Sequence, residues 1–478
     1  MVAEGKPGCC QEKLQIYKKM NAADARAIFD DLDQMLPIER EFAEVFRNKE
    51  TTRNKLIIGL HRFSKHMLEQ YEKQAQAAKV QGRKQRRIEF TTGDPHLKKA
   101  YKKLGNHTAP PMQFLRRDVP GPQGEPVGTW TATPAEIDEI TIRKWGQVFY
   151  GNVTNLAGCV FEFFCKYATF LHWKPEFKLE PVCPHTLMQL ILDAEETTGG
   201  LDGWQLEDLK LLNLTAFVWL AKMYDSIEHG ANWPSSAQHA RAAYLVKDDQ
   251  KLDDPLSYRG LLIMALVYRH YATLRLGSMH DWIKGWATDS MFAGVPGAGA
   301  EDAAWLTALE MEHNAVHNIP VSGGGADIRK CFDAIIRQLV YFLLWIAGCP
   351  RGVITAYRNM MERMIVYNTL TSGLGKPHKR RCGIPQGCPF SMMIMALLMR
   401  PWIMVMATFS VNPRVLADDV FLCAKGEWHV EFFTQAYAAT LQYIEDLGAR
   451  TAPEKSFVVS TSEAARQWYG NFTWPIIK

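Results

Sequence analysis

The stretch Arg414-Val415-Leu416-Ala417-Asp418-Asp419-Val420-Phe421-Leu422 places two adjacent carboxylates between two apolar runs. This pattern predicts a buried β-hairpin with Asp418 and Asp419 at its tip. Carboxylates buried side by side are costly unless a positive group neutralises them. A divalent cation such as Mg²⁺ suits the role, because it prefers oxygen ligands. The alternative is a solvated Asp-Asp turn, which we favour for the other Asp-Asp pairs of the chain.

Two further motifs accompany this hairpin. The first, upstream, is Ala326-Asp327-Ile328-Arg329-Lys330-Cys331-Phe332-Asp333. The second lies between this stretch and the hairpin and reads Gly383-Ile384-Pro385-Gln386-Gly387-Cys388-Pro389-Phe390-Ser391. Carboxylates from separate strands can hold two Mg²⁺ ions about 4 Å apart, an arrangement that serves in-line phosphoryl transfer. The three acids therefore indicate transfer of a nucleotide to a 3′-hydroxyl.

The order of these motifs resembles the palm motifs A, B and C of reverse transcriptases. Thr197-Thr198-Gly199-Gly200-Leu201-Asp202-Gly203-Trp204 is similar to a turn that precedes the fingers of LINE-type (non-LTR) retrotransposon reverse transcriptases. The resemblance covers roughly residues 136–470. It implies an α+β right-hand polymerase fold, with fingers at 136–325 and a ferredoxin-like palm at 326–470.

The resemblance also implies roles for the acids and their neighbours. Asp327 would bridge two Mg²⁺ ions (or Mn²⁺), Asp418 would ligate them, and Asp419 would complete the cluster. Phe332 occupies the steric-gate position, where an aromatic ring beneath C2′ would exclude a 2′-hydroxyl; core packing is the alternative. Gln386 and Gly387 would lie near the templating base.

The resemblance further implies two fingers strands that bring cations to the triphosphate. Lys247 ends Ala243-Tyr244-Leu245-Val246-Lys247, and Arg259 lies within Leu256–Leu262. A polyphosphate requires fixed positive charge, and Arg can bind two oxygens at once. Lys455, before Phe457-Val458-Val459, resembles the general acid of motif D, although Ala452 stands where the family often has Asn.

Two motif residues have simpler predicted roles. Asp333 suits the N-cap of a helix from Ala334 to Ala347. Ser391 suits a cap of the helix that follows it. The run Gly323-Gly324-Gly325 before Asp327 departs from the family, which has an apolar strand there. The length of the first palm strand is therefore left open by the sequence.

Charge is unevenly distributed along the 478 residues. The net charge is only +4, yet residues 51–120 hold sixteen Lys and Arg against five Asp and Glu. Such a surplus suggests a surface for a polyanion, or else a solvated helix pair. We expect a basic helical extension at 1–105, with Arg83, Lys84, Arg86 and Arg87 as nucleic-acid-binding residues or a nuclear signal.

Composition narrows the remaining organisation. Six prolines between Gly105 and Pro134 predict a linker or irregular wrap at 106–135. Helical patterns predict a block from Ala135 to Trp173. Ten cysteines without metal-binding spacing indicate reduced, intracellular thiols. Arg400-Pro401 divides the apolar window Met392–Phe409, which favours a buried helix over a membrane span. Only 59 residues follow Asp419, so the thumb is expected to be largely absent.

The sequence thus predicts an RNA-directed DNA polymerase of a retroelement. Its partners would be an RNA template, a DNA primer and dNTP, with a thumb or endonuclease supplied separately and no membrane. A nuclear location, a cytoplasmic ribonucleoprotein, or both would follow from the family. Two alternatives stay open: an RNA-dependent RNA polymerase, and a decayed or domesticated copy that only binds RNA.

Overall fold

The computed structural model describes residues 112–247, 251–371 and 373–474, together with Lys55, Gly59 and Arg62. The chain divides into two compact units, residues 1–108 and 109–478, and the elements below belong to the second. Apart from those three positions, the basic extension predicted at 1–105 lies outside the described residues. The same holds for its candidate residues Arg83, Lys84, Arg86 and Arg87.

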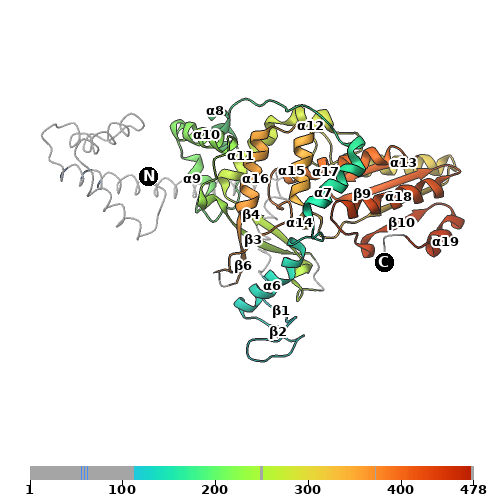
Figure 1. The fold of residues 1–478 in the computed structure, drawn as a ribbon, viewed down its shortest axis with the longest axis horizontal. Coiled ribbons are helices and arrows are strands. Elements are labelled where there is room, and N and C mark those ends of the chain that lie inside the picture. Colours follow the sequence, from blue (N-terminus) through green and yellow to red (C-terminus); the bar gives the residue numbers. More distant parts are fainter. Residues whose placement is uncertain are drawn as a thin grey trace, which may run out of the picture. The chain divides into compact units, whose positions relative to one another are not determined.

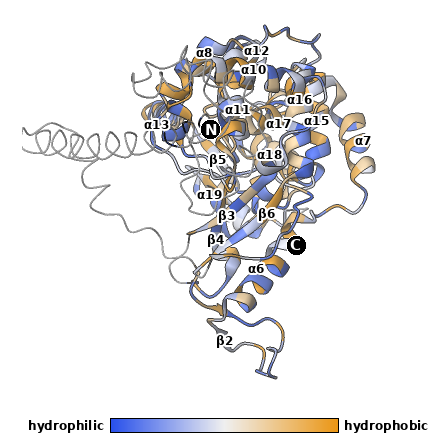
Figure 2. Ribbon diagram, turned by 90° about the vertical axis from the view of Figure 1, so that its left-hand side faces the viewer, coloured by the Kyte–Doolittle hydropathy of each residue, from blue (hydrophilic) through white to orange (hydrophobic). Residues whose placement is uncertain are grey.

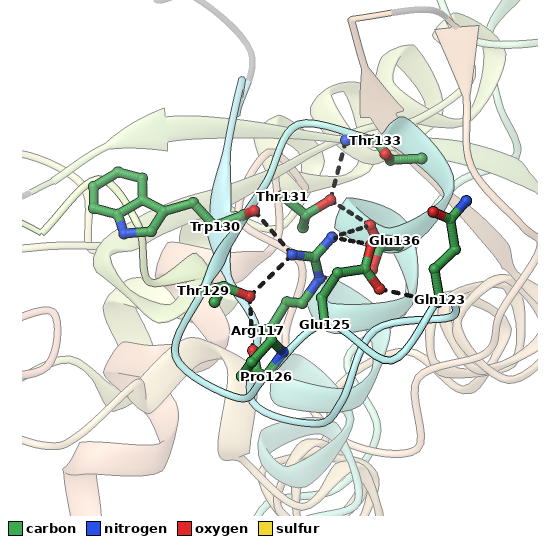
Figure 3. Close-up of polar contacts among 9 residues, drawn as sticks. All are labelled: Arg117, Gln123, Glu125, Pro126, Thr129, Trp130, Thr131, Thr133 and Glu136. Atoms are coloured by element: carbon green, nitrogen blue, oxygen red, sulfur yellow. Dashed lines mark hydrogen bonds and ion pairs between the residues drawn. The ribbon is translucent and has the colours of Figure 1, made fainter.

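Residues 112–133 form an irregular but packed segment. Strands β1 (Leu115–Arg116) and β2 (Trp130–Thr131) pair antiparallel. Arg117 is buried and donates to both carboxylate oxygens of Glu136, at 3.0 and 2.9 Å (Figure 3). A guanidinium fork matches carboxylate geometry, so this pair holds the loop against the helix that carries Glu136. Residues 112–133, within the segment predicted as a linker or irregular wrap, are thus irregular and tied to a helix by an ion pair that composition alone does not reveal.

Two helices make up most of the helical block predicted from Ala135 to Trp173. Helix α6 (Pro134–Phe149) starts with a proline, which suits the first helical turn. Helix α7 (Leu156–Tyr167) follows after a turn in which Gly151 has a φ of 78°. Helix α6 carries both hydrophilic and hydrophobic residues along its length (Figure 2). Its apolar face, which includes Trp145, is buried against the core.

The first four-stranded sheet has the order β4-β3-β6-β7. Strands β3 (His239–Val246) and β4 (Tyr258–Ile263) pair antiparallel, which confirms the two strands predicted beside Lys247 and Arg259. Strand β6 (Ile365–Leu370) joins β3 in parallel, and β7 (Gly373–Leu374) joins β6 antiparallel. Lys247 follows β3 directly, so one hairpin carries both cations.

The second four-stranded sheet has the order β10-β5-β9-β8, and all of its neighbours are antiparallel. Its strands are β5 (Val321–Ala326), β8 (Asn412–Leu416), β9 (Asp419–Lys425) and β10 (Phe457–Ser460). Helix α18 (His429–Asp446) connects β9 to β10 and packs on β5 and β9. Gly448, with a φ of 74°, follows the C-cap residue Leu447 and ends the helix.

The glycine run lies inside β5, which is six residues long and fully buried. A Cβ on Gly324 would come within 2.7 Å of the Phe433 ring on α18 and 2.6 Å of the Phe457 carbonyl on β10. Glycine weakens a strand but permits close backbone approach. The first palm strand is therefore present, and tight packing on both sides explains its composition.

Helix α17 (Ser391–Met406) is the buried helix predicted after the second motif, and Pro401 lies within it. No helix in the described part of the chain is long and apolar enough to cross a membrane. Figure 1 shows α8, α10 and α11 grouped on one side of this unit, with α18, β9 and β10 on the other. Further helices are α8 (Pro184–Leu192), α9 (Leu206–Lys210), α10 (Leu214–Glu228), α11 (Leu266–Ser278), α12 (His280–Trp286), α13 (Ala300–Val316), α14 (Cys331–Ala334), α15 (Arg337–Ile346), α16 (Arg351–Arg363) and α19 (Glu463–Asn471).

Candidate active site

A cavity of about 910 Å³ is lined by Arg259 of strand β4, by Asp327 and Asp418, which adjoin strands of the other four-stranded sheet, and by residues of all three motifs. Asp419 is the first residue of β9 and lies beside the cavity, next to Asp418 in the chain. The predicted site residues in the lining are Lys247, Arg259, Asp327, Phe332, Gln386, Gly387, Asp418 and Lys455.

Asp327 follows the last residue of β5 and is held through its backbone. Its N–H donates to the Ser456 hydroxyl at 3.2 Å, and its carbonyl accepts from Ala452 N at 2.8 Å. The Lys455 ammonium lies 3.7 Å from the Asp327 carboxylate. The first acid is thus fixed against the segment that enters β10, and it faces the predicted proton donor.

Asp418 and Asp419 lie at the tip of the β8-β9 hairpin, as predicted. Ala417 has a φ of 60°, an uncommon conformation for a residue with a Cβ, and this marks a tight turn. The prediction that both acids are buried is wrong, because the tip borders an open cavity: Asp418 is half-buried and Asp419 is exposed. Partial burial still raises the pKa of both carboxyls, and the charge of Asp327 raises each pKa further.

The donor chemistry of the three acids fits a divalent cation. Asp327 and Asp419 flank the paired residues Ala326 and Val420 on adjacent strands, so the carboxylates come from neighbouring backbone positions. Their mutual repulsion is what a bound cation would offset. Among the described residues, no three His, Cys, Asp or Glu side chains already form a metal cage. A bound cation would compete with Lys455 for the Asp327 carboxylate.

The three cations predicted from the sequence, Lys247, Arg259 and Lys455, all line the same cavity. Burial lowers the pKa of Lys247, and the positive charges of Lys455 and Arg259 lower it further. Fixed charges of one sign repel one another unless an anion lies between them. The cluster therefore suits a polyphosphate, to which Arg offers two donors and Lys a compact charge.

The loop Gly383–Ser391 connects the cavity to strand β4. Leu262 N on β4 donates to the Gln386 carbonyl at 2.8 Å. Gly387 has a φ of 116°, and a Cβ there would lie 2.4 Å from the Leu262 carbonyl, so glycine is required. Ser391 is the first residue of α17, and its hydroxyl donates to the Pro385 carbonyl at 2.8 Å. The predicted capping role of Ser391 is wrong, because the hydroxyl closes the loop instead.

Phe332 and Asp333 lie in the short helix α14. Phe332 is half-buried, and its carbonyl accepts from Ile384 N at 2.6 Å. The N-cap prediction for Asp333 is wrong, because Asp333 lies inside α14, which ends at Ala334, and the next helix, α15, starts only at Arg337. Asp333 is buried, which raises its pKa to about 6. Gln386 Nε2 donates to it at 3.3 Å, and Arg380 lies 3.8 Å away.

Lys330 is a site residue that sequence reasoning missed. It adopts a left-handed φ of 49°, and its ammonium donates to the carbonyls of Leu256 and Tyr258 at 2.5 and 3.1 Å. The ammonium also lies 4.6 Å from the Trp145 ring centre, and burial lowers its pKa to about 8. Lys330 therefore ties the first motif to strand β4. Its position three residues after Asp327, within the first motif, was the feature of the sequence that could have identified it.

The fold and site together define a protein with acids and cations arranged for phosphoryl transfer. Residues 257–470 match the family model described as reverse transcriptase (RNA-dependent DNA polymerase). The family that this part of the chain matches implies an RNA-directed DNA polymerase, which is a nucleotidyltransferase. Domains of this family generally use divalent metal ions and bind an RNA template, a primer and dNTP. No curated protein sequence matches the chain.

Proposed function

We propose that this chain is the reverse transcriptase of a LINE-like retroelement, which transfers nucleotides from dNTP to a primer 3′-hydroxyl by a two-metal mechanism. Asp327 and Asp418 line one cavity together with Lys247, Arg259 and Lys455, and Asp419 lies beside it. This arrangement, which falls mostly within the matched residues 257–470, carries the proposal. The strand order β10-β5-β9-β8 supports a ferredoxin-like palm at 326–470, and the β3-β4 hairpin supports fingers at 136–325.

The acids would hold the cations and the basic residues would hold the nucleotide. Mg²⁺ or Mn²⁺ bound by Asp327, Asp418 and Asp419 would activate the primer hydroxyl and neutralise the triphosphate. Lys247 and Arg259 would grip the triphosphate oxygens and align the chain of phosphates with the primer.

Three further contacts would complete the reaction. As the new O3′–P bond forms and the bond to pyrophosphate breaks, Lys455 would give a proton to the departing pyrophosphate. Its side chain is 49% exposed, so it can exchange Asp327 for this partner. Phe332 would lie beneath the sugar, and the Gln386-Gly387 backbone would support the templating base.

Primer extension on an RNA template tests the proposal. We expect extension with dNTP, little with rNTP, complete loss on chelation with EDTA, and recovery on addition of Mg²⁺ or Mn²⁺. Extension with rNTP alone would identify an RNA-dependent RNA polymerase. RNA binding without extension under any of these conditions would identify an RNA-binding remnant.

A further inference from the structure

A second cavity, of about 840 Å³, shares helix α6 with the candidate active site. Lys144 and Val148 line the first cavity, whereas Arg143 and Phe149 line the second. The second cavity is bordered by the loop that runs into Gly383, and Cys382 N in that loop donates to the Phe149 carbonyl at 3.0 Å. The two cavities are therefore neighbours that share a helix and a loop.

The lining of the second cavity is basic. Three consecutive cations, Lys379, Arg380 and Arg381, contribute to it, and none has a role in the reaction proposed above. Lys379 and Arg381 are exposed and form no ion pair with any described residue. The single carboxylate of the lining, Glu362, already accepts from the Tyr341 hydroxyl at 2.7 Å. The cavity thus has a surplus of positive charge that no described carboxylate balances fully.

Arg380 shows where an acceptor is missing. The residue is 7% exposed, and Tyr244 and Asp333 are its polar neighbours, yet its Nε and Nη2 atoms make no hydrogen bond within the geometric limits. Its Nη1 atom lies 3.8 Å from Asp333, beyond hydrogen-bond distance, and its guanidinium lies 3.9 Å from the centre of the Phe149 ring. Buried donors without acceptors are unfavourable. An oxyanion in the cavity would supply those acceptors.

An exposed aromatic ring lies at the same place. Tyr150, at the end of α6, lines the cavity and is 58% exposed. The Arg381 guanidinium lies 5.0 Å from its ring centre. Cations that hold phosphates beside an open aromatic ring are the elements of sites for single-stranded nucleic acid, where bases stack and the backbone is neutralised.

We propose that this second cavity binds phosphates of a single-stranded nucleic acid, with Arg380 and its two neighbours as the anion-binding residues and Tyr150 as a stacking platform. The inference rests on the proposed function, since a polymerase presents such a strand to the protein. The strand held there would continue toward the Gln386-Gly387 loop, because residues 379–381 lead directly into it.

The test is RNA affinity over a salt series, measured on the full chain in EDTA without dNTP, so that no synthesis takes place. The probe is a labelled, unstructured RNA of 15 nucleotides. Lys379→Gln/Arg381→Gln is compared with the matched control Lys178→Gln/Lys284→Gln, which removes two exposed charges elsewhere. The slope of log affinity against log salt is negative, and each lost phosphate contact makes it shallower by about 0.7. We expect a slope that is shallower by about 1.4 in the first variant and the wild-type slope in the control.

Two further measurements distinguish a strand from a small anion and from a structural cluster. Tyr150→Ala should lower the affinity for RNA about fivefold or more at fixed salt. The slope of affinity against salt should not change, because base stacking involves no charge. Pyrophosphate is the free-anion probe, read as a rise in melting temperature. If both slopes equal that of wild type while pyrophosphate stabilises only the wild type and control, the cavity takes a small anion and the strand assignment is overturned. If neither readout differs, the cations are structural and the site is overturned.

Equal melting temperatures of the variants without ligand check that both fold. The binding test needs no catalysis, so it separates this inference from the proposed function. If the slopes of wild type and variant differ as expected but the wild type extends no primer, the nucleic-acid site is supported and the polymerase assignment is refuted.

Discussion

The two four-stranded sheets contribute opposite charges to one cavity. The carboxylate sheet, β10-β5-β9-β8, supplies Asp327 and Asp418, and the cation sheet, β4-β3-β6-β7, supplies Lys247 and Arg259. Aspartate has a short side chain, so its carboxylate position is set by the strand beneath it. Lysine and arginine have long stems, so the strand sets only their general position. Charges that must coordinate metal are therefore placed rigidly, and charges that meet a mobile triphosphate are placed adaptably.

Substitutions in the carboxylate sheet should have the largest effect and therefore give the strictest test of the two assigned roles. Asp327→Ala or Asp418→Ala should lower the rate of primer extension more than about a hundredfold, because each 1.4 kcal/mol lost from the transition state is about tenfold in rate. Asp418→Glu should lose nearly as much, since one methylene displaces the carboxylate. RNA affinity should stay near that of wild type. Single-turnover extension and RNA binding are the measurements.

The control for the acids is Asp281→Ala, which removes an exposed carboxylate from α12. It should leave extension unchanged. Retention of more than a tenth of wild-type activity in either Asp→Ala variant would contradict the metal role.

Alteration of the cation sheet should give a smaller effect of a different kind. Lys247→Gln and Arg259→Gln should each raise KM for dNTP by about tenfold to a hundredfold, which is the worth of a charge-assisted hydrogen bond. Lys247→Arg should be mild, because the long stem can adjust. Steady-state extension over a dNTP series measures this, with Lys284→Gln as the control. An unchanged KM in both Gln variants would show that the cations do not contact the triphosphate.

The comparison also shows what the sequence could predict. The hairpin at Asp418 and the helix after the second motif follow from local apolar patterns, and the structure has both. The strands beside Lys247 and Arg259 follow from the family resemblance, and the structure has these as well. The Gly323–Gly325 strand did not follow, because its cause is the close approach of other elements. Tertiary packing overrides local propensity there.

Buried polar residues were the least predictable part of the site. Asp333 precedes a helical pattern and so resembles an N-cap. The helix that contains it ends at Ala334, however, and its side chain is buried beside Arg380. Arg380 stands between two exposed cations, and nothing local marks it as the buried one. Such residues are defined by partners distant in the chain, which a single sequence does not reveal.

Asp333 provides a third prediction, on pH. Burial raises its pKa from 3.8 to about 6, so the folded chain keeps a proton that the unfolded chain has released. The stability from this group is fully present below pH 3.8 and is lost as pH rises through about 6. We expect the slope of unfolding free energy against pH between these values to differ between wild type and Asp333→Asn, by at most about 1.4 kcal/mol per pH unit. Denaturant unfolding at several pH values measures it, and parallel slopes would contradict the assignment.

The smallest expected effect concerns the choice between ribose and deoxyribose nucleotides in the cavity between the two sheets. Phe332 lines the cavity, and its backbone is held by Ile384 N, so truncation of the ring should leave the loop in place. Phe332→Val should raise the ratio of rNTP to dNTP incorporation about tenfold, at the lower end of what a missing methylene changes in a pocket. Competitive single-nucleotide incorporation measures the ratio independently of the overall rate. The control is Phe342→Val on α15, which makes the same truncation where the ring packs on Phe164 at the edge of the core. The control should reduce stability and leave the ratio unchanged. An unchanged ratio in an active Phe332→Val enzyme would mean that the ring only packs, and that selection of the sugar lies elsewhere in the cavity.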